Sequence, residues 1–118
     1  MRALIVEDEP IFRMDLAHRL RKFGFSQVEE TAYAAESIEM ARSEAFDIIF
    51  MDIRLKDELS GLDAARSIAE DLPYPIVVMS AYKMMEEEIR RSVPTLRAFI
   101  SKPLSDQALE LALAVGVR

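Results

Sequence analysis

Five short apolar runs, each followed by a segment with helical character, constrain the fold of this chain more than any other feature. The strongest runs are residues 3–6, 48–51 and 76–79, and the weaker ones are residues 27–32 and 98–100. Strands that are apolar throughout and alternate with helices belong to a parallel sheet covered by helices on both faces. The sequence therefore predicts an α/β fold with right-handed crossovers between its strands.

Helical patterns fill the intervals between these runs. Pro10 suits the first turn of a helix, and Gly24 suits its end because glycine tolerates the left-handed turn that follows. Apolar side chains between them recur at spacings of four, four and three, on one helix face: Phe12, Leu16, Leu20 and Phe23. Further helices are predicted over residues 34–45, 62–72 and 83–93. Ser105 is predicted to cap a last helix that runs through residue 115 and stops at Gly116.

The composition fits one globular domain and narrows the classes of partner. The chain has 118 residues, of which 51% are hydrophobic and 31% charged, so it has enough apolar side chains for one core. Cysteine is absent, which excludes disulfides and thiolate metal sites and is compatible with a reducing cytoplasm. The apolar runs are too short to cross a membrane, and the N-terminus does not resemble a signal peptide.

The net charge of -6 disfavours nucleic acid as a direct partner, because phosphate binding needs a basic surface. One stretch, HRLRK at residues 18–22, is basic although the chain as a whole is acidic. Two interpretations of it stay open: the solvated face of a helix, or a docking patch for an acidic partner.

Polar and charged residues stand where four of the five predicted strands end. Glu7 and Asp8 follow the first strand, Asp52 the third, Ser80 the fourth and Lys102 the fifth. In an open parallel sheet, ligands bind beyond the carboxyl ends of the strands. These five side chains are therefore expected to share one cleft.

Three carboxylates in one cleft need a compensating cation. Two carboxylates about 4 Å apart repel by roughly 4 kcal/mol at an effective dielectric constant of about 20. Hard oxygen ligands suit Mg²⁺, which retains waters and binds phosphate oxygens. Lys102 offers a positive charge to a phosphoryl oxygen, and Ser80 offers a hydroxyl donor. The residues thus predict a site for Mg²⁺ and a phosphoryl group, with one carboxylate, presented by a rigid strand, as the nucleophile.

Five motifs in order resemble the receiver domain of two-component response regulators. They are LIVEDEP, FDIIFMDIRL, SGLDAAR, IVVMSAY and AFISKPLS, which together extend over almost the whole chain. The spacings also agree with that family, since Asp8 and Asp52 are 44 residues apart and Ser80 and Lys102 are 22 apart. The first acid is Glu7 rather than aspartate, and Lys56 stands where the family often has proline.

This resemblance implies a flavodoxin-like (βα)5 fold of three layers, with parallel strand order 2-1-3-4-5, in a single receiver domain over residues 1–118. Asp52 would be the phosphoacceptor. Glu7 and Asp8 would bind Mg²⁺ together with Asp52 and the backbone carbonyl of Arg54.

The resemblance further implies a phosphorelay function in the cytoplasm. A sensor histidine kinase or phosphotransfer protein would donate the phosphoryl group, and Lys102 would neutralise its oxygens. Ser80 would then turn toward the phosphoryl group and let the aromatic switch residue Phe99 rotate inward. The surface of the fourth helix, fifth strand and fifth helix would change, for an effector protein, a fused domain or a homodimer partner. The Lys102–Pro103 bond would be cis.

Two rival functions remain open at this point. One is a receiver-like binding module that is never phosphorylated, although the complete set of site residues argues against it. The other is a Mg²⁺-dependent phosphohydrolase resembling the haloacid dehalogenase group, which needs a second acid where this chain has Arg54. A receiver domain, by contrast, is no enzyme beyond its own phosphorylation and dephosphorylation. Arg54 and Tyr82 are bulky and are predicted to shield the phosphoryl group from water.

Overall fold

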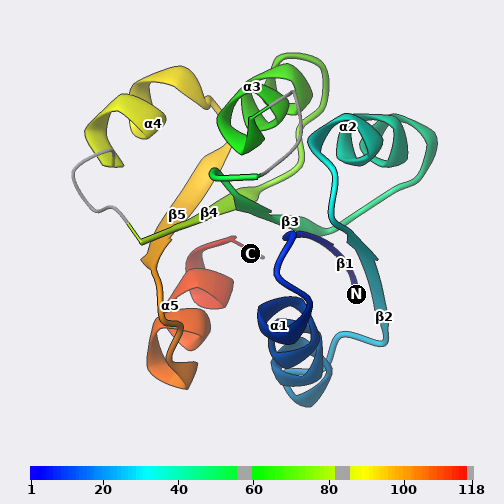
Figure 1. Cartoon of the computed structure of the whole chain (residues 1–118), viewed down its shortest axis with the longest axis vertical. Helices are drawn as coiled ribbons and strands as arrows, with labels where there is room; N and C mark the ends of the chain where they lie inside the picture. Colours follow the sequence, from blue (N-terminus) through cyan, green and yellow to red (C-terminus); the bar gives the residue numbers. More distant parts are fainter. Residues whose placement is uncertain (56–59, 82–85, 117–118) are drawn as a thin grey trace.

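The computed structural model describes residues 1–55, 60–81 and 86–116, and strands alternate with helices throughout (Figure 1). The elements are β1 (Arg2–Val6), α1 (Pro10–Lys22), β2 (Gln27–Thr31), α2 (Ala34–Ser43), β3 (Ile48–Asp52), α3 (Gly61–Asp71), β4 (Ile76–Ser80), α4 (Glu86–Ser92), β5 (Leu96–Ser101) and α5 (Asp106–Gly116). Among the helices described, none is both long and apolar enough to cross a bilayer.

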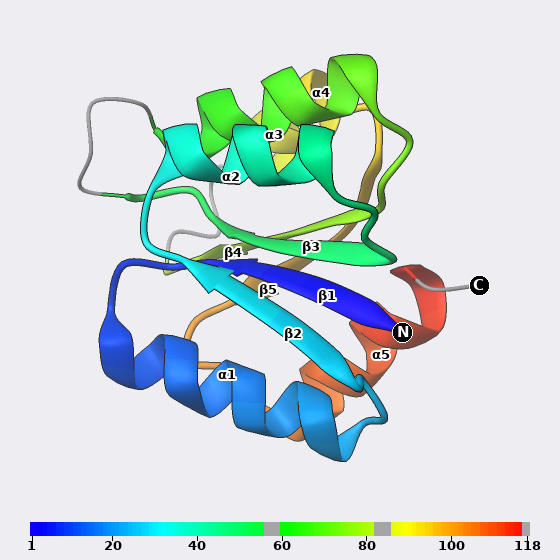
Figure 2. The same ribbon diagram turned by 90° about the vertical axis from the view of Figure 1, so that its right-hand side faces the viewer.

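The strands form one parallel sheet in the order β2-β1-β3-β4-β5. Helices α2, α3 and α4 cover one face of this sheet, and α1 and α5 cover the other (Figure 2). The predicted flavodoxin-like (βα)5 fold of three layers, with strand order 2-1-3-4-5, is thereby confirmed.

The central strands are buried on both sides because they alternate side chains between two hydrophobic cores. In β3, Ile49 and Met51 join the core beneath α2, α3 and α4, which we call the α2–α3–α4 core. Ile48 and Phe50 of the same strand join the α1–α5 core on the opposite face. Each residue of β3 and β4 is buried, which explains why these two strands read as continuous apolar runs.

Helix α1 packs on the sheet through the predicted apolar stripe. Leu16 and Leu20 are fully buried, and Phe12 and Phe23 pack against the same α1–α5 core while remaining partly exposed. Gly24 follows the helix with a φ of +100°, the left-handed region in which glycine is favoured.

A salt bridge ties the two helices on this face together. The Nη1 atom of Arg19 in α1 lies 2.5 Å from Oδ1 of Asp106 in α5. The Nε atom of Arg19 lies 2.9 Å from Oδ2 of Asp15 in its own helix.

The two outer strands of the sheet differ from the central ones. β2 forms one edge and is only partly buried, with Gln27, Glu29 and Glu30 among its side chains. β5 forms the other edge and is longer than predicted, since it begins at Leu96 instead of residue 98. Leu96 and Arg97 were not predicted as part of this strand because its side chains are a mixture of polar and apolar residues. The pairing of β5 with β4 shifts register between Ile76 and Val77.

The helix boundaries differ from the predictions by one or two residues. α2 ends at Ser43, before the predicted residue 45, and α3 begins at Gly61. Residues 83–85 of the predicted fourth helix lie outside the described part of the chain. The amide of Ala108 donates to the Ser105 hydroxyl at 3.1 Å, as a capping residue requires, and α5 includes Gly116, which was predicted to stop it.

Gly61 allows α3 to begin directly against the end of β3. A Cβ atom at this position would lie 1.8 Å from the carbonyl oxygen of Asp52 and 2.7 Å from the Cα of Ile53. Both contacts are with backbone, so no side-chain rotation would relieve them. Glycine is therefore a steric requirement of the segment that positions Asp52.

Gly61→Ala is expected to lower the free energy of unfolding by about 1–3 kcal/mol, because the backbone of α3 or β3 has to move to accept the methyl group. Urea unfolding followed by circular dichroism measures the change. Glu70→Ala on the exposed side of the same helix is the matched control, with an expected change within about 0.5 kcal/mol. Equal stability of Gly61→Ala and the wild type would contradict this packing.

Candidate functional site

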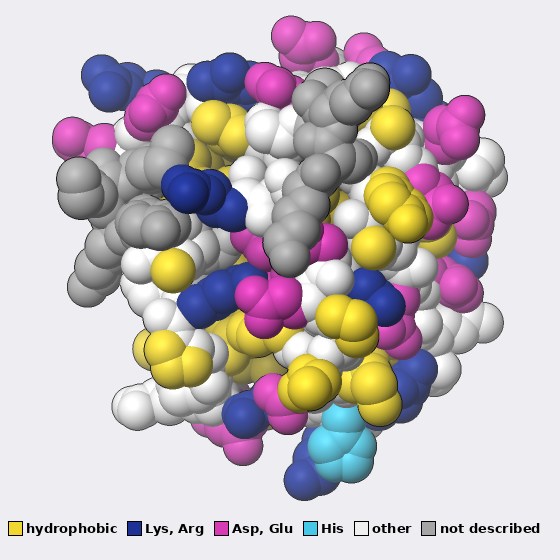
Figure 3. Space-filling model, in the orientation of Figure 1, with side chains coloured by type: hydrophobic (Ala, Val, Ile, Leu, Met, Phe, Trp, Pro, Cys, Tyr) yellow, Lys and Arg dark blue, Asp and Glu magenta, His cyan; other side chains and the backbone are white. Residues whose placement is uncertain are grey.

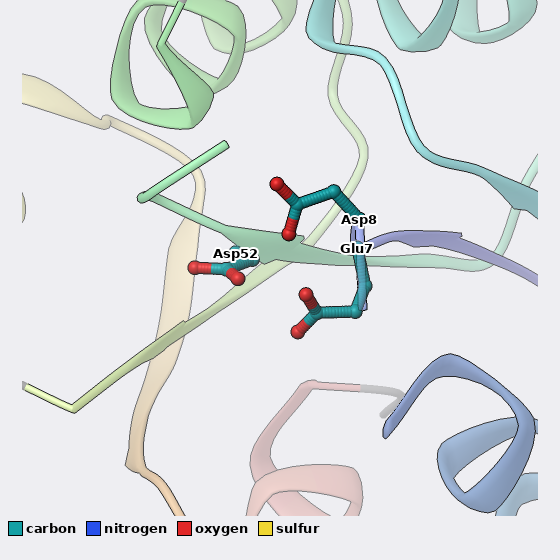
Figure 4. Close-up of side chains that lie close together, drawn as sticks. All are labelled: Glu7, Asp8 and Asp52. Carbon is teal, nitrogen blue, oxygen red and sulfur yellow. The ribbon is translucent and has the colours of Figure 1, made fainter. Parts of the chain in front are cut away.

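The carboxyl ends of β1, β3, β4 and β5 bring the predicted site residues to one edge of the sheet. Glu7 and Asp8 directly follow β1, and Asp52 is the last residue of β3. Carboxylate oxygens of these three residues all lie within 4.8 Å of one another. In Figure 4 the side chains of Glu7 and Asp8 reach from the end of β1 toward Asp52.

Lys102 is the cation of this cluster. Its Nζ atom lies 2.5 Å from Oε1 of Glu7 and 2.9 Å from Oδ2 of Asp52. Glu7 is fully buried, Asp52 is 4% exposed, and the Lys102 side chain is 17% exposed. In a site of such low exposure these charge-assisted hydrogen bonds are stronger than they would be in water. In Figure 3, acidic and basic side chains adjoin at the centre of this face, above an apolar area.

Backbone groups fix the orientation of Asp52. The amide of Arg54 donates to Oδ1 of Asp52 at 2.9 Å, so each carboxylate oxygen has a donor. The amide of Ile53 donates to the carbonyl of Met79 at 3.3 Å, which continues the pairing of β3 with β4. The carboxylate is thus presented by a strand that is held on both sides by its neighbours.

Glu7 is held from four directions. Its own amide donates to the carbonyl of Thr31 at 3.0 Å, and the amide of Glu9 donates to its Oε2 at 3.1 Å. The guanidinium of Arg13 donates to its carbonyl oxygen at 2.7 Å, and Lys102 contacts Oε1. The loop between β1 and α1 is therefore anchored at the residue that enters the site.

Burial raises the pKa of Glu7 to about 7, and the nearby carboxyl of Asp52 acts in the same direction. Hydrogen bonds from Lys102 and from the amide of Glu9 oppose this rise. Burial also disfavours the charge on Lys102, but its hydrogen bonds to Glu7 and Asp52 outweigh burial and raise the pKa of the ammonium. Negative charge is therefore costly at Glu7, and positive charge is favoured at Lys102.

The donor set fits a hard divalent cation. Lys102 contributes one positive charge to a cluster of three carboxyl groups, and the remaining carboxylate repulsion would be relieved by a second cation. Three carboxylate oxygens are a suitable set of ligands for Mg²⁺, which keeps several of its own waters. The backbone of Arg54 lies beside the cluster through its hydrogen bond to Asp52.

Ser80 lies at this end of the sheet, and Phe99 lies within the neighbouring edge strand β5. Ser80 ends β4 and is fully buried, and its carbonyl oxygen accepts a hydrogen bond from the Lys102 amide at 2.9 Å. Phe99 on β5 is partly buried and packs against the α2–α3–α4 core. It also lines a groove of about 450 Å³ between β5 and α5, together with Arg90 of α4 and Leu111 of α5. The predicted cis bond between Lys102 and Pro103 is present.

Two residues that sequence reasoning did not single out also contact the site. The ring centroid of Phe12 lies 4.2 Å from Nζ of Lys102, and Arg13 binds the carbonyl of Glu7. The sequence identified Phe12 only as a member of the apolar stripe of this helix. Its position on the first turn of α1 explains why its ring contacts Lys102. His18 is exposed, in agreement with a surface position in the basic stretch. Lys56 and Tyr82 lie outside the described residues.

The comparison with known families decides the classification. The family model of the response regulator receiver domain matches residues 3–114. The chain belongs to this family. A transcriptional regulatory protein, PdtaR of Mycobacterium tuberculosis, is 35% identical over 116 residues, which cover 98% of this chain and 56% of that protein. The sensory transduction protein LytR of Staphylococcus haemolyticus is 37% identical over 81 residues, covering 68% of this chain and 31% of LytR. The receiver domain thus spans about half the length, or less, of these curated relatives.

Solved structures agree with the fold of the receiver domain. The N-terminal domain of a three-domain response regulator protein from Carboxydothermus hydrogenoformans has a TM-score of 0.84 at 27% identity, covering 100% of this chain and 94% of that one. The receiver domain of the Pseudomonas aeruginosa sensor histidine kinase PA1611, solved with magnesium in its active-site cleft, has a TM-score of 0.82 at 24% identity. That match covers 97% of this chain and 95% of the other.

Between pH 5 and pH 7, the contribution of Glu7 to the free energy of unfolding of the metal-free protein is expected to fall as pH rises. The pKa of Glu7 is about 7 in the folded protein against 4.5 ordinarily, so the folded state holds a proton that the unfolded state releases. This one group contributes at most about 1.4 kcal/mol per pH unit, and its contribution levels off above pH 7. Urea titrations in a chelating buffer measure the slope.

Glu7→Gln is expected to flatten this slope, because glutamine does not titrate. Glu9→Gln, at the exposed neighbouring carboxyl, is the matched control and is expected to retain the wild-type slope. Identical slopes in Glu7→Gln and the wild type would contradict the assignment to Glu7.

Proposed function

We propose that this receiver domain is the phosphoacceptor of a two-component or phosphorelay system and that Asp52 takes the phosphoryl group in a Mg²⁺-dependent reaction. The observation that carries this proposal is the position of the Asp52 carboxylate, which sits at the end of a fully buried strand beside Lys102, Glu7 and Asp8. The donor is a phosphohistidine on a sensor kinase or a phosphotransfer protein.

In the proposed reaction, an oxygen of Asp52 attacks phosphorus in line with the bond from phosphorus to the donor imidazole. A new O–P bond forms, the P–N bond breaks, and its electron pair remains on the imidazole. Lys102 faces the acceptor carboxylate and stabilises the negative charge on the phosphoryl oxygens. The amide of Arg54 keeps the carboxylate in one orientation, which reduces the entropy lost in reaching the reactive geometry.

Four groups of this chain would hold Mg²⁺: the side chains of Glu7, Asp8 and Asp52 and the backbone carbonyl of Arg54. When bound, the ion supplies positive charge to the phosphoryl oxygens and offsets the repulsion among the three carboxylates. The ionised form of Glu7 would favour binding of Mg²⁺. Because Glu7 lies on the anchored loop after β1, its carboxylate is held at the site without rearrangement of the backbone.

Phosphorylation replaces the carboxylate of Asp52, with a charge of -1, by an acyl phosphate with a charge of about -2, and this change is the proposed signal. The hydroxyl of Ser80 hydrogen-bonds the new phosphoryl oxygens. Phe99 then turns inward from its partly buried position, which changes the surface formed by α4, β5 and α5. Two conformations biased by one local charge change suffice for this switch.

The altered surface is proposed to act on an effector protein or on a fused domain, and it is also the proposed face for a homodimer. Residues 1–118 then form a single receiver domain that works in the cytoplasm. The proposed chemistry is confined to this protein's own phosphorylation and dephosphorylation, so the chain is no enzyme toward other substrates.

Incubation of the protein with Mg²⁺ and a small phosphodonor, such as acetyl phosphate or phosphoramidate, tests the proposal directly. The wild type is expected to gain the mass of one phosphoryl group, and the gain should disappear when a chelator removes Mg²⁺. Asp52→Asn is the matched variant, because it keeps the shape of the side chain and removes the nucleophilic charge. Intact-mass spectrometry measures the phosphoryl gain of the wild type with and without chelator and of Asp52→Asn. Equal phosphorylation of Asp52→Asn and the wild type would refute Asp52 as the phosphoacceptor.

A phosphohydrolase would behave differently in the same experiment. Continuous turnover of a generic phosphate ester would favour that rival, whereas the proposal predicts almost none. A protein that gains no mass from any small phosphodonor would favour the unphosphorylated binding module.

Ser80→Ala separates phosphorylation from switching. The variant is expected to gain the phosphoryl mass within about threefold of the wild-type rate, because the Asp52 carboxylate and Lys102 remain in place. The rotation of Phe99 should be lost, because the variant lacks the Ser80 hydroxyl that hydrogen-bonds the phosphoryl oxygens. Fluorine NMR of the protein labelled with fluorophenylalanine, with Phe99→Leu assigning the signal, measures this response. A full shift of the Phe99 signal in Ser80→Ala would contradict the proposed coupling.

A further inference from the structure

The first turn of α1 places an aromatic ring against the cation of the site. The ring centroid of Phe12 lies 4.2 Å from Nζ of Lys102, within the distance at which an ammonium is attracted to a ring face. Phe12 is partly buried and packs against the α1–α5 core, so the ring itself is held. The contact joins residues 90 positions apart in the chain.

Lys102 needs such a contact because its side chain is long and flexible. An ammonium group on a four-carbon stem has three N–H donors and no preferred direction of its own. Contacts to Glu7 and Asp52 account for two partners, at 2.5 and 2.9 Å. The ring of Phe12 adds a third surface that is apolar and attracts positive charge, so it excludes water while it favours the cation.

We propose that Phe12 is a positioning residue whose ring holds the Lys102 ammonium between Glu7 and Asp52. Through Lys102 the ring raises the rate at which Asp52 accepts a phosphoryl group. This inference rests on the function proposed above and adds a residue that does not itself touch the reacting atoms.

The same helix offers a matched control for simple packing. Phe23 stands at the other end of the apolar stripe, about 16 Å along the helix axis from Phe12. It is likewise partly exposed and packs against the same α1–α5 core. A change from phenylalanine to leucine therefore removes comparable packing at either position, but only at Phe12 does it remove the ring beside Lys102.

The first test compares the rates at which a small phosphodonor and Mg²⁺ add phosphoryl mass to three variants. Phe12→Leu is expected to slow the reaction by about three- to tenfold, whereas Phe12→Tyr, which keeps the ring face, stays within about twofold of the wild type. Phe23→Leu is also expected to stay within about twofold. A wild-type rate in Phe12→Leu, or an equal loss in Phe23→Leu, would overturn the inference.

A double-mutant cycle shows whether Phe12 acts through Lys102. In a Lys102→Met background, adding Phe12→Leu is expected to change the rate by less than about twofold, because the charge on which the ring acts is gone. The same three- to tenfold loss in that background would show that Phe12 works by another route, and the proposal would fail.

Lysine reactivity tests the contact without any phosphorylation. In metal-free protein, acetic anhydride and mass spectrometry give the acetylation rate of Lys102 relative to that of exposed Lys22. Phe12→Leu is expected to raise this ratio by about threefold or more, and Phe23→Leu and Phe12→Tyr should leave it unchanged. An unchanged ratio in Phe12→Leu counts against the inference alone, whereas a wild type that gains no phosphoryl mass counts against the proposed function.

Discussion

The ammonium of Lys102 between two buried carboxyl groups is the interaction on which the rest of this site depends. Glu7 and Asp52 are brought together at the edge of the sheet with almost no exposure to solvent, and without a cation their approach would be strongly unfavourable. Lys102 offsets part of that cost. The repulsion that Lys102 does not offset favours the binding of a divalent ion in the cluster. The same crowding of carboxyl groups therefore causes the electrostatic cost and underlies the proposed function.

The parallel sheet makes this arrangement possible. Glu7 and Lys102 are 95 residues apart, yet each follows a strand whose carboxyl end faces the same edge. Because β3 and β4 are buried on both faces, the strands that carry Asp52 and Ser80 have no room to shift. Gly61 removes the remaining steric conflict behind Asp52. The last residues of the strands, together with the residues that directly follow them, thus supply the chemistry of the site.

Much of this was predictable from the sequence, and the exceptions have physical reasons. The apolar runs at β1, β3 and β4 identified the parallel sheet, and the polar residues at their ends identified Glu7, Asp8 and Asp52, because burial on both faces leaves an unmistakable pattern. The start of β5 was missed because an edge strand needs fewer apolar residues. The roles of Phe12 and Arg13 were missed because helical periodicity identifies a buried face but not which cation or carbonyl lies across from it.

The open edge of the sheet at β2 has a consequence for how copies of this domain meet. An edge strand exposes unpaired backbone groups to which another strand could add. Here that edge carries Glu29 and Glu30, whose carboxylates form salt bridges with Arg2 and Arg13 of the same chain. Charged side chains on an edge strand disfavour the addition of another strand, so they oppose the growth of continuous sheets. Association of two copies through the β2 edge is therefore disfavoured.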